Sequence, residues 1–255
     1  MPAKRGFHFS TWLIITASLM TGCGLLPSLN SNSRIEKAQM NLEMGSRYLE
    51  LGMLDIAKTK LETALSLDSS NPEIHNALAI FYERVHDNEQ AEQHYQTAQR
   101  KNPDNLDIQN NYGRFLCQHG KYQQGISLLE KSIESALNTQ TWFAQTNLGI
   151  CYALQNQLSR AEQYFRQALL TQPDYPPALL EMQKISYHNR QYLSARAFME
   201  RYLSVGIHTA ESLWIAFQTE RALGNTKLAE EYSQQLLNSF PSSKQAQQIK
   251  SVISN

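Results

Sequence analysis

Valine, glycine and proline are all scarce in this sequence. Among 255 residues there are three valines against 32 leucines and 22 alanines, with only 11 glycines and 8 prolines. Valine favours strands, whereas leucine and alanine favour helices. The composition therefore predicts an all-α fold. With 42% hydrophobic residues the chain can also bury a core, which excludes disorder throughout.

An excess of charge of either sign is also absent, because 23 basic residues balance 23 acidic ones. Binding to nucleic acid requires a clustered basic surface, so we expect no nucleic-acid partner. The sequence has no Gly-rich phosphate loop, no G-x-S-x-G, no H-E-x-x-H and no C-x-x-C motif. We therefore expect neither an enzyme nor a cofactor or metal site.

The N-terminus has the pattern of an export signal. Lys4 and Arg5 precede a short apolar stretch over residues 12–20, which is too short to cross a membrane. A basic start followed by such a stretch is typical of a signal peptide. Thr21 and Gly22 then precede Cys23, which resembles the lipobox of bacterial lipoproteins, where the cysteine is acylated and becomes the first residue.

This pattern divides the chain into three parts. We predict a signal peptide over residues 1–22, a lipidated Cys23 with a flexible tether over residues 23–33, and a folded domain over residues 34–255. Because Gly24 and not aspartate follows the cysteine, resemblance to Gram-negative sorting rules implies an anchor in the outer membrane. The alternative is an ordinary secretory signal followed by an unmodified cysteine.

A repeat of about 34 residues runs through the folded part. Small residues recur at spacings of 34, 34, 36, 34 and 34, at Ala57, Ala91, Gly125, Ala161, Ala195 and Ala229. Together with Leu148-Gly149, Tyr152, Phe165 and Pro173, this spacing resembles the tetratricopeptide repeat. The resemblance implies six helix-turn-helix copies over residues 38–241, stacked as a solenoid, with a capping helix in Ser242–Asn255. Left-handed turn residues are expected at Gly52, Gly120, Asn156 and Gly224.

In repeats of this kind the first helix of each pair lines a concave groove. Carrying the family's groove positions over to this chain implies a partner-binding groove made of Leu42, Asn76, Ile80, Asn110, Arg114, Thr146, Ile150, Lys184 and Trp214, with Ser46, Leu180 and Gln218 beside them. Such a groove takes a partner's helix or extended peptide. The alternative for any one of these residues is packing against a neighbouring helix.

The remaining cysteines and histidines leave few candidate sites. Cys117 and Cys151 lie near the ends of first helices in adjacent repeats, and in an exported chain they form either a disulfide or two buried free thiols. The histidines are spread over different repeats, without the spacing of a metal site, at His75, His86, His94, His119, His188 and His208. We expect them to be exposed or capping imidazoles.

Signal, lipobox and six repeats together resemble the PilF/PilW family of type IV pilus biogenesis lipoproteins, the pilotins of the pilus secretin. The phrases Ala57-Lys58 through Asp68 and Asn110 through Cys117 are similar to that family. The resemblance implies an outer-membrane lipoprotein facing the periplasm that binds secretin subunits and promotes their localisation and multimerisation. The alternative is a general tetratricopeptide adaptor that scaffolds cell-envelope assembly proteins.

Overall fold

The computed structural model describes residues 29–253, and the regular structure within that range is entirely helical. Twelve helices of this range form six antiparallel pairs, and one more follows them. In chain order they are α1 (Leu29–Glu50), α2 (Leu54–Leu67), α3 (Pro72–Arg84), α4 (Asn88–Lys101), α5 (Leu106–Gln118), α6 (Tyr122–Glu134), α7 (Thr141–Leu154), α8 (Leu158–Thr171), α9 (Pro176–His188), α10 (Tyr192–Val205), α11 (Ala210–Ala222), α12 (Thr226–Ser239) and α13 (Lys244–Ile253).

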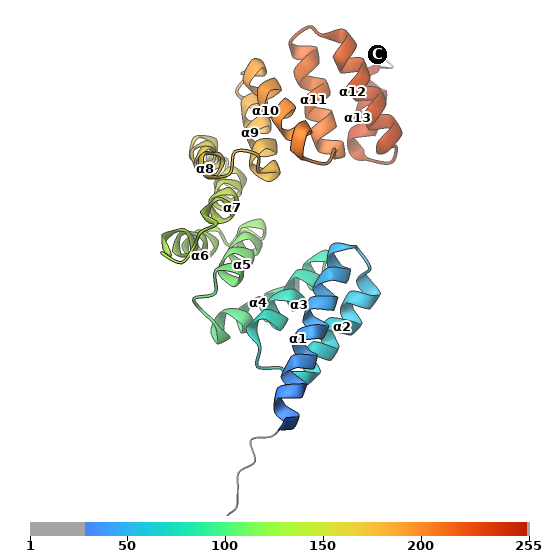
Figure 1. Cartoon of the computed structure of the whole chain (residues 1–255). Helices are drawn as coiled ribbons and strands as arrows, with labels where there is room; N and C mark the ends of the chain where they lie inside the picture. The colour runs from blue at the N-terminus through green and yellow to red at the C-terminus, as the bar shows by residue number, and fades with distance from the viewer. Residues whose placement is uncertain (1–28, 254–255) are drawn as a thin grey trace, which may run out of the picture.

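The six pairs stack in chain order into a curved solenoid. In Figure 1 the stack runs from the blue pair α1–α2 through α5–α8 to the orange and red helices α9–α13. This architecture confirms the expected all-α tetratricopeptide fold. The last helix, α13, covers the final pair and buries Ala246 and Ile249 completely, as a capping helix must.

The N-terminal boundary differs from the expectation. The predicted signal peptide over residues 1–22 and the predicted lipidation site Cys23 lie outside the described residues. The predicted tether extends to residue 33, whereas α1 already begins at Leu29. Extending a helix that packing has already stabilised needs much less free energy than nucleating one, so α1 includes polar residues that carry no helical pattern of their own.

Small residues at the repeated positions set the distance between paired helices. Ala57, Ala91 and Ala161 are fully buried. A Cβ atom added to Gly149 would lie only 2.6 Å from Cε1 of Phe165, and one added to Gly125 would lie 2.6 Å from the carbonyl oxygen of Gly113. Contacts this short leave no room for a side chain at either glycine. The 34-residue period of small residues therefore marks the positions where paired helices touch.

The turns inside the pairs are also repeated. Gly52, Gly120, Asn156 and Gly224 all have positive φ, between 59° and 76°, which confirms the four expected left-handed residues. The equivalent residues of the second and fifth pairs are His86 and Arg190, with φ of 62° and 59°, and the sequence did not mark them. At each turn the next N–H donates to a carbonyl five residues earlier, as in Lys121 to Leu116 at 2.8 Å, so all six turns share one geometry.

Polar side-chain contacts join several of the neighbouring pairs, but not the first two. Arg114 on α5 pairs with Glu83 on α3 at 2.8 Å, and Arg196 on α10 pairs with Glu220 on α11. In the part of the chain that the structure describes, no hydrogen bond or ion pair joins α1 or α2 to α3 or α4. Apolar packing therefore holds the first pair against the second.

A helix that crosses a bilayer needs about 20 predominantly apolar residues. Within residues 29–253, none of the helices combines that length with sufficient hydropathy.

Candidate partner-binding groove

A groove of about 570 Å³ lies between α1, α3 and the first turn of α5. Its floor is apolar and is formed by Leu42, Leu49, Ala77, Ile80 and Ile108. Four of these side chains are buried in the free protein, and Ile80 is half-buried. The groove therefore offers apolar surface at the bottom of an open channel, which suits the side chains of an inserted peptide or helix.

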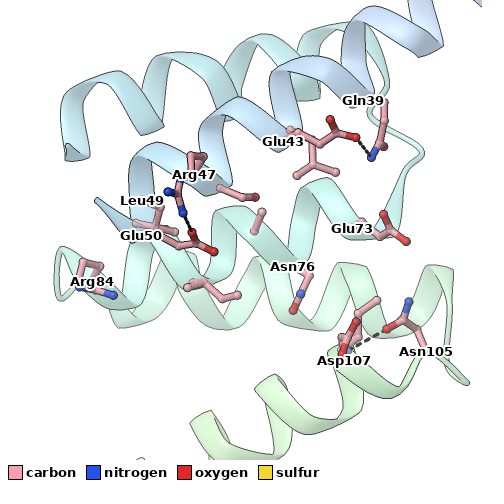
Figure 2. Close-up of a pocket in the computed structure, with 15 residues that line it drawn as sticks. Gln39, Glu43, Arg47, Leu49, Glu50, Glu73, Asn76, Arg84, Asn105 and Asp107 are labelled. Carbon is pink, nitrogen blue, oxygen red and sulfur yellow. Dashed lines mark hydrogen bonds and ion pairs between the residues drawn. The ribbon is translucent and has the colours of Figure 1, made fainter. Parts of the chain in front are cut away.

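The rim of the groove is charged, mainly by acids. Glu43, Glu50, Glu73 and Asp107 line it together with Arg47 and Arg84. Figure 2 shows Arg47 Nη1 paired with Glu50 Oε2 at 2.9 Å, and Gln39 Nε2 donating to Glu43 Oε1 at 3.0 Å. The acids outnumber the bases, so the rim attracts a cationic segment more than an anionic one. The family's groove positions did not predict this rim, because its charged residues lie at other positions of the repeat.

Three of the nine predicted groove residues meet in this groove. Leu42 and Ile80 form part of the floor, and Asn76 stands on the α3 side with its oxygen accepting from Asn111 Nδ2 at 3.4 Å. Ser46, which was expected beside them, also lines it. The candidate groove therefore contains only part of the predicted set, and the other six residues lie elsewhere on the solenoid.

The other predicted groove residues in the third and fourth repeats are engaged inside the fold. Asn110 is buried and accepts from Asn147 Nδ2 at 2.8 Å. Thr146 is buried, and its hydroxyl donates to the Trp142 carbonyl at 2.8 Å within α7. Arg114 holds Glu83 through two hydrogen bonds of 2.8 and 3.0 Å. Ile150 is half-buried against the core. Asn110 and Thr146 therefore stabilise the stack, whereas Arg114 and Ile150 remain partly exposed.

The predicted residues of the last repeats lie apart from the groove. Lys184 pairs with Glu181 at 2.7 Å and with Glu211 at 2.9 Å, and it lines a different cavity. Trp214 is half-buried, with its ring 5.6 Å from that of Phe217. Leu180 and Gln218 are also half-buried and line none of the larger cavities. Neither Lys184 nor Trp214 therefore belongs to the groove of the first two repeats.

The two cysteines of the repeats are joined by a disulfide. Cys117 on α5 and Cys151 on α7 have Cα atoms 5.2 Å apart, and both residues are buried. Of the two possibilities left open by the sequence, the structure has the bond. It ties the first helices of the third and fourth repeats together.

Two of the histidines form a pair that the sequence did not predict. His75 on α3 and His94 on α4 approach to 3.0 Å between their Nδ1 atoms, and His75 Nε2 lies 3.1 Å from the Ser69 carbonyl oxygen. The His94 ring stacks on Tyr82 at 5.4 Å. They are 19 residues apart, which no simple motif marks. Among the described residues no group of three or more potential ligands comes together for a metal ion, so the pair is an internal contact.

This pair predicts that stability falls in mild acid. Burial, followed by repulsion from His75, lowers the pKa of His94 from 6.5 to about 4, and burial also lowers the pKa of His75. The unfolded chain therefore binds more protons, and the stabilisation is complete above pH 6.5 and decreases toward pH 4. We expect a loss of ~1–3 kcal/mol over that range, measured by urea unfolding at several pH values. A His94→Asn variant should lose much less, and an identical loss in both proteins would contradict the assignment.

Comparison with known proteins agrees with this architecture. The tetratricopeptide repeat family matches residues 104–169, which span α5 to α8. The type IV pilus assembly protein PilF of Pseudomonas aeruginosa is 26% identical over 234 residues, which cover 90% of this chain and 93% of that protein. An uncharacterised protein of Haemophilus influenzae is 30% identical over 120 residues, covering 47% of this chain and 65% of that protein.

Two solved structures extend the similarity to three dimensions. The structure of Pseudomonas aeruginosa PilF aligns with a TM-score of 0.71 and 26% identity, over 86% of this chain and 99% of that one. PilW, described as a widely conserved type IV pilus biogenesis factor, aligns with a TM-score of 0.71 and 28% identity, over 87% of this chain and 99% of that one. The chain has a tetratricopeptide-repeat fold and is similar to PilF and PilW over most of its length.

Proposed function

We propose that this chain is a non-enzymatic outer-membrane lipoprotein of type IV pilus biogenesis that binds secretin subunits and promotes their localisation and multimerisation. The observation that carries the proposal is the similarity to PilF, which extends over 90% of this chain and 93% of that protein. A match of this extent aligns the whole repeat array and not only a common repeat unit. A general envelope adaptor, which is the alternative, would share only the repeats with PilF.

The groove of the first two repeats supports protein binding. Repeat solenoids present extended concave surfaces to partners, and this groove adds an apolar floor to an acidic rim. Burial of apolar surface contributes ~25 cal/mol per Å² removed from water, so even a short inserted segment gains affinity from the floor. We assign the groove to a segment of the secretin subunit.

The disulfide between Cys117 and Cys151 supports export independently of the N-terminal pattern. Disulfides persist in the periplasm and outside the cell and are rare in the cytosol. Export is consistent with a signal peptide over residues 1–22, and acylation of Cys23 would then provide a stable membrane anchor.

The binding test compares an isoleucine that lines the groove, Ile80, with one that does not, Ile56. Ile80→Glu places a charge on the groove floor, next to an acidic rim, and should abolish or strongly weaken binding of the purified secretin subunit. Ile56→Glu changes an exposed residue of α2 that does not line the groove, and it should bind like the unchanged protein. Circular dichroism checks that both variants fold.

Fractionated cells test the location. The Cys23→Ser variant should leave the outer-membrane fraction, and the secretin should then fail to assemble there.

If both isoleucine variants bind the secretin normally, the groove is not the site. The general adaptor is the correct function under two conditions. The secretin localises and multimerises normally in cells that lack this protein, and a different envelope protein co-purifies with this protein.

A further inference from the structure

Two further cavities lie at the turn between α9 and α10; Figure 1 shows these two helices in the upper half of the picture. One, of about 420 Å³, is lined by Lys184, Tyr187, His188, Arg190, Tyr192 and Ile215. The other, of about 270 Å³, is lined by Arg190, Gln191, Tyr192, Leu193, Ser194 and Leu223. Arg190 and Tyr192 belong to both, so the two cavities meet at one turn.

Arg190 occupies a backbone position that does not favour arginine. Its φ is 59°, whereas three of the five equivalent turns use glycine, one uses asparagine and one uses histidine. The left-handed conformation is unfavourable for residues with a Cβ atom, and glycine adopts it freely. A turn of this geometry is therefore formed more easily without arginine, and strain of this kind is found where a side chain has a role of its own.

The lysine and arginine side chains that line these cavities are basic, whereas the charged residues around the first groove are mostly acidic. Lys184 and Arg190 line them, and no aspartate or glutamate does. Lys184 already pairs with Glu181 and Glu211. The Arg190 guanidinium, by contrast, makes no hydrogen bond or ion pair with any residue of the described range 29–253. Its five donors are available to an anion, and a planar guanidinium binds a carboxylate through two parallel hydrogen bonds.

The surroundings of Arg190 favour a peptide over a small anion. The Tyr187 and Tyr192 rings lie 5.6 Å apart. Ile215, Leu193 and Leu223 add apolar surface. Together the cavities exceed what an inorganic anion fills, and they suit a carboxylate side chain with apolar neighbours on the same segment.

We infer that the α9–α10 turn is a second docking site, which binds an acidic, partly apolar segment of a protein partner through Arg190. The site lies in repeats five and six and is separate from the acidic-rimmed groove of repeats one and two. It does not depend on the lipid anchor or on the identity of the partner in the first groove.

The test uses a defined probe and a matched pair of variants. The probe is an acetylated, amidated nonapeptide of alternating leucine and glutamate, and the control peptide has lysine in place of glutamate. Arg190→Gly removes the guanidinium and relieves the turn, so it should weaken binding of the glutamate peptide roughly ten-fold or more while the melting temperature stays equal or rises. His86→Gly makes the same backbone change in the second repeat and should leave binding unchanged.

Two further measurements distinguish a peptide site at Arg190 from binding in the first groove and from a simple anion site. The Ile80→Glu variant, altered in the first groove, should bind the glutamate peptide as the unchanged protein does. Inorganic phosphate at equal concentration should compete poorly. Equal affinity of Arg190→Gly and the unchanged protein for the glutamate peptide would overturn the site. So would a lysine peptide whose binding Arg190→Gly weakens to the same extent. Phosphate binding as tight as peptide binding would overturn the assignment to a protein segment.

Discussion

Replacing both Cys117 and Cys151 with alanine should lower the free energy of unfolding by about 3 to 4 kcal/mol. The bond closes a loop of sequence separation 34 between two buried positions. Cross-links over loops of this length restrict the unfolded chain by an amount between the ~3 kcal/mol of a 15-residue loop and the ~4.7 kcal/mol of a 100-residue loop. Urea unfolding of the two proteins under non-reducing conditions measures the difference.

A reducing agent provides the control for this prediction. The unchanged protein in reductant should lose nearly the same stability as the double alanine variant, whereas reductant should not affect the variant. If the oxidised protein and the variant unfold at the same urea concentration, the bond does not stabilise the solenoid.

Replacing Arg196 with methionine should be similarly damaging, by about 3 to 5 kcal/mol. Glu220 is completely buried, and Arg196 Nε donates to its Oε1 at 2.8 Å across α10 and α11. Removing only the arginine leaves a buried carboxylate without its partner. This destabilises a protein more than replacing both members of the pair by apolar residues. Urea unfolding at neutral pH gives the loss.

Two comparisons isolate the cause. The double variant Arg196→Met with Glu220→Met replaces the pair by apolar side chains and should recover most of the lost stability. Arg166→Met removes an exposed partner of Glu162 on α8 and should cost no more than about 0.5 kcal/mol. A double variant as unstable as the single one would show that the loss comes from packing and not from the unpaired charge.

The repeat architecture could be predicted from the sequence because its period records local contacts. Gly149 and Ala161 mark where paired helices touch, and Gly52, Gly120 and Gly224 mark turns whose φ few other residues adopt. Arg190 and His86 escaped notice because their side chains give no signal for a left-handed turn. The start of α1 at Leu29 was also missed, since helix extension depends on packing behind it.

The candidate site was predicted only in part, because its composition depends on contacts between repeats. Thr146 and Asn110 occupy groove positions of the family, yet both are buried, and Asn110 accepts a hydrogen bond from Asn147 of the next repeat. Arg114 is held by a carboxylate 31 residues away. The acidic rim likewise joins residues of three successive repeats. The His75–His94 contact lies within one repeat, but it depends on how α3 packs against α4 and follows from no simple spacing.

The interface between the first two helix pairs lacks polar contacts among the described residues, and this should affect the local stability of the first pair. Stability in a repeat array is a sum over units and the contacts between neighbours, and a terminal unit has one neighbour. Among the described residues, no hydrogen bond or ion pair joins α1 or α2 to α3 or α4. We therefore expect the amide hydrogens of α1 and α2 to exchange with solvent through openings of lower free energy than those of the helices that the disulfide joins. The groove lies at this interface, so we expect its α1 wall to open more readily than its α3 wall.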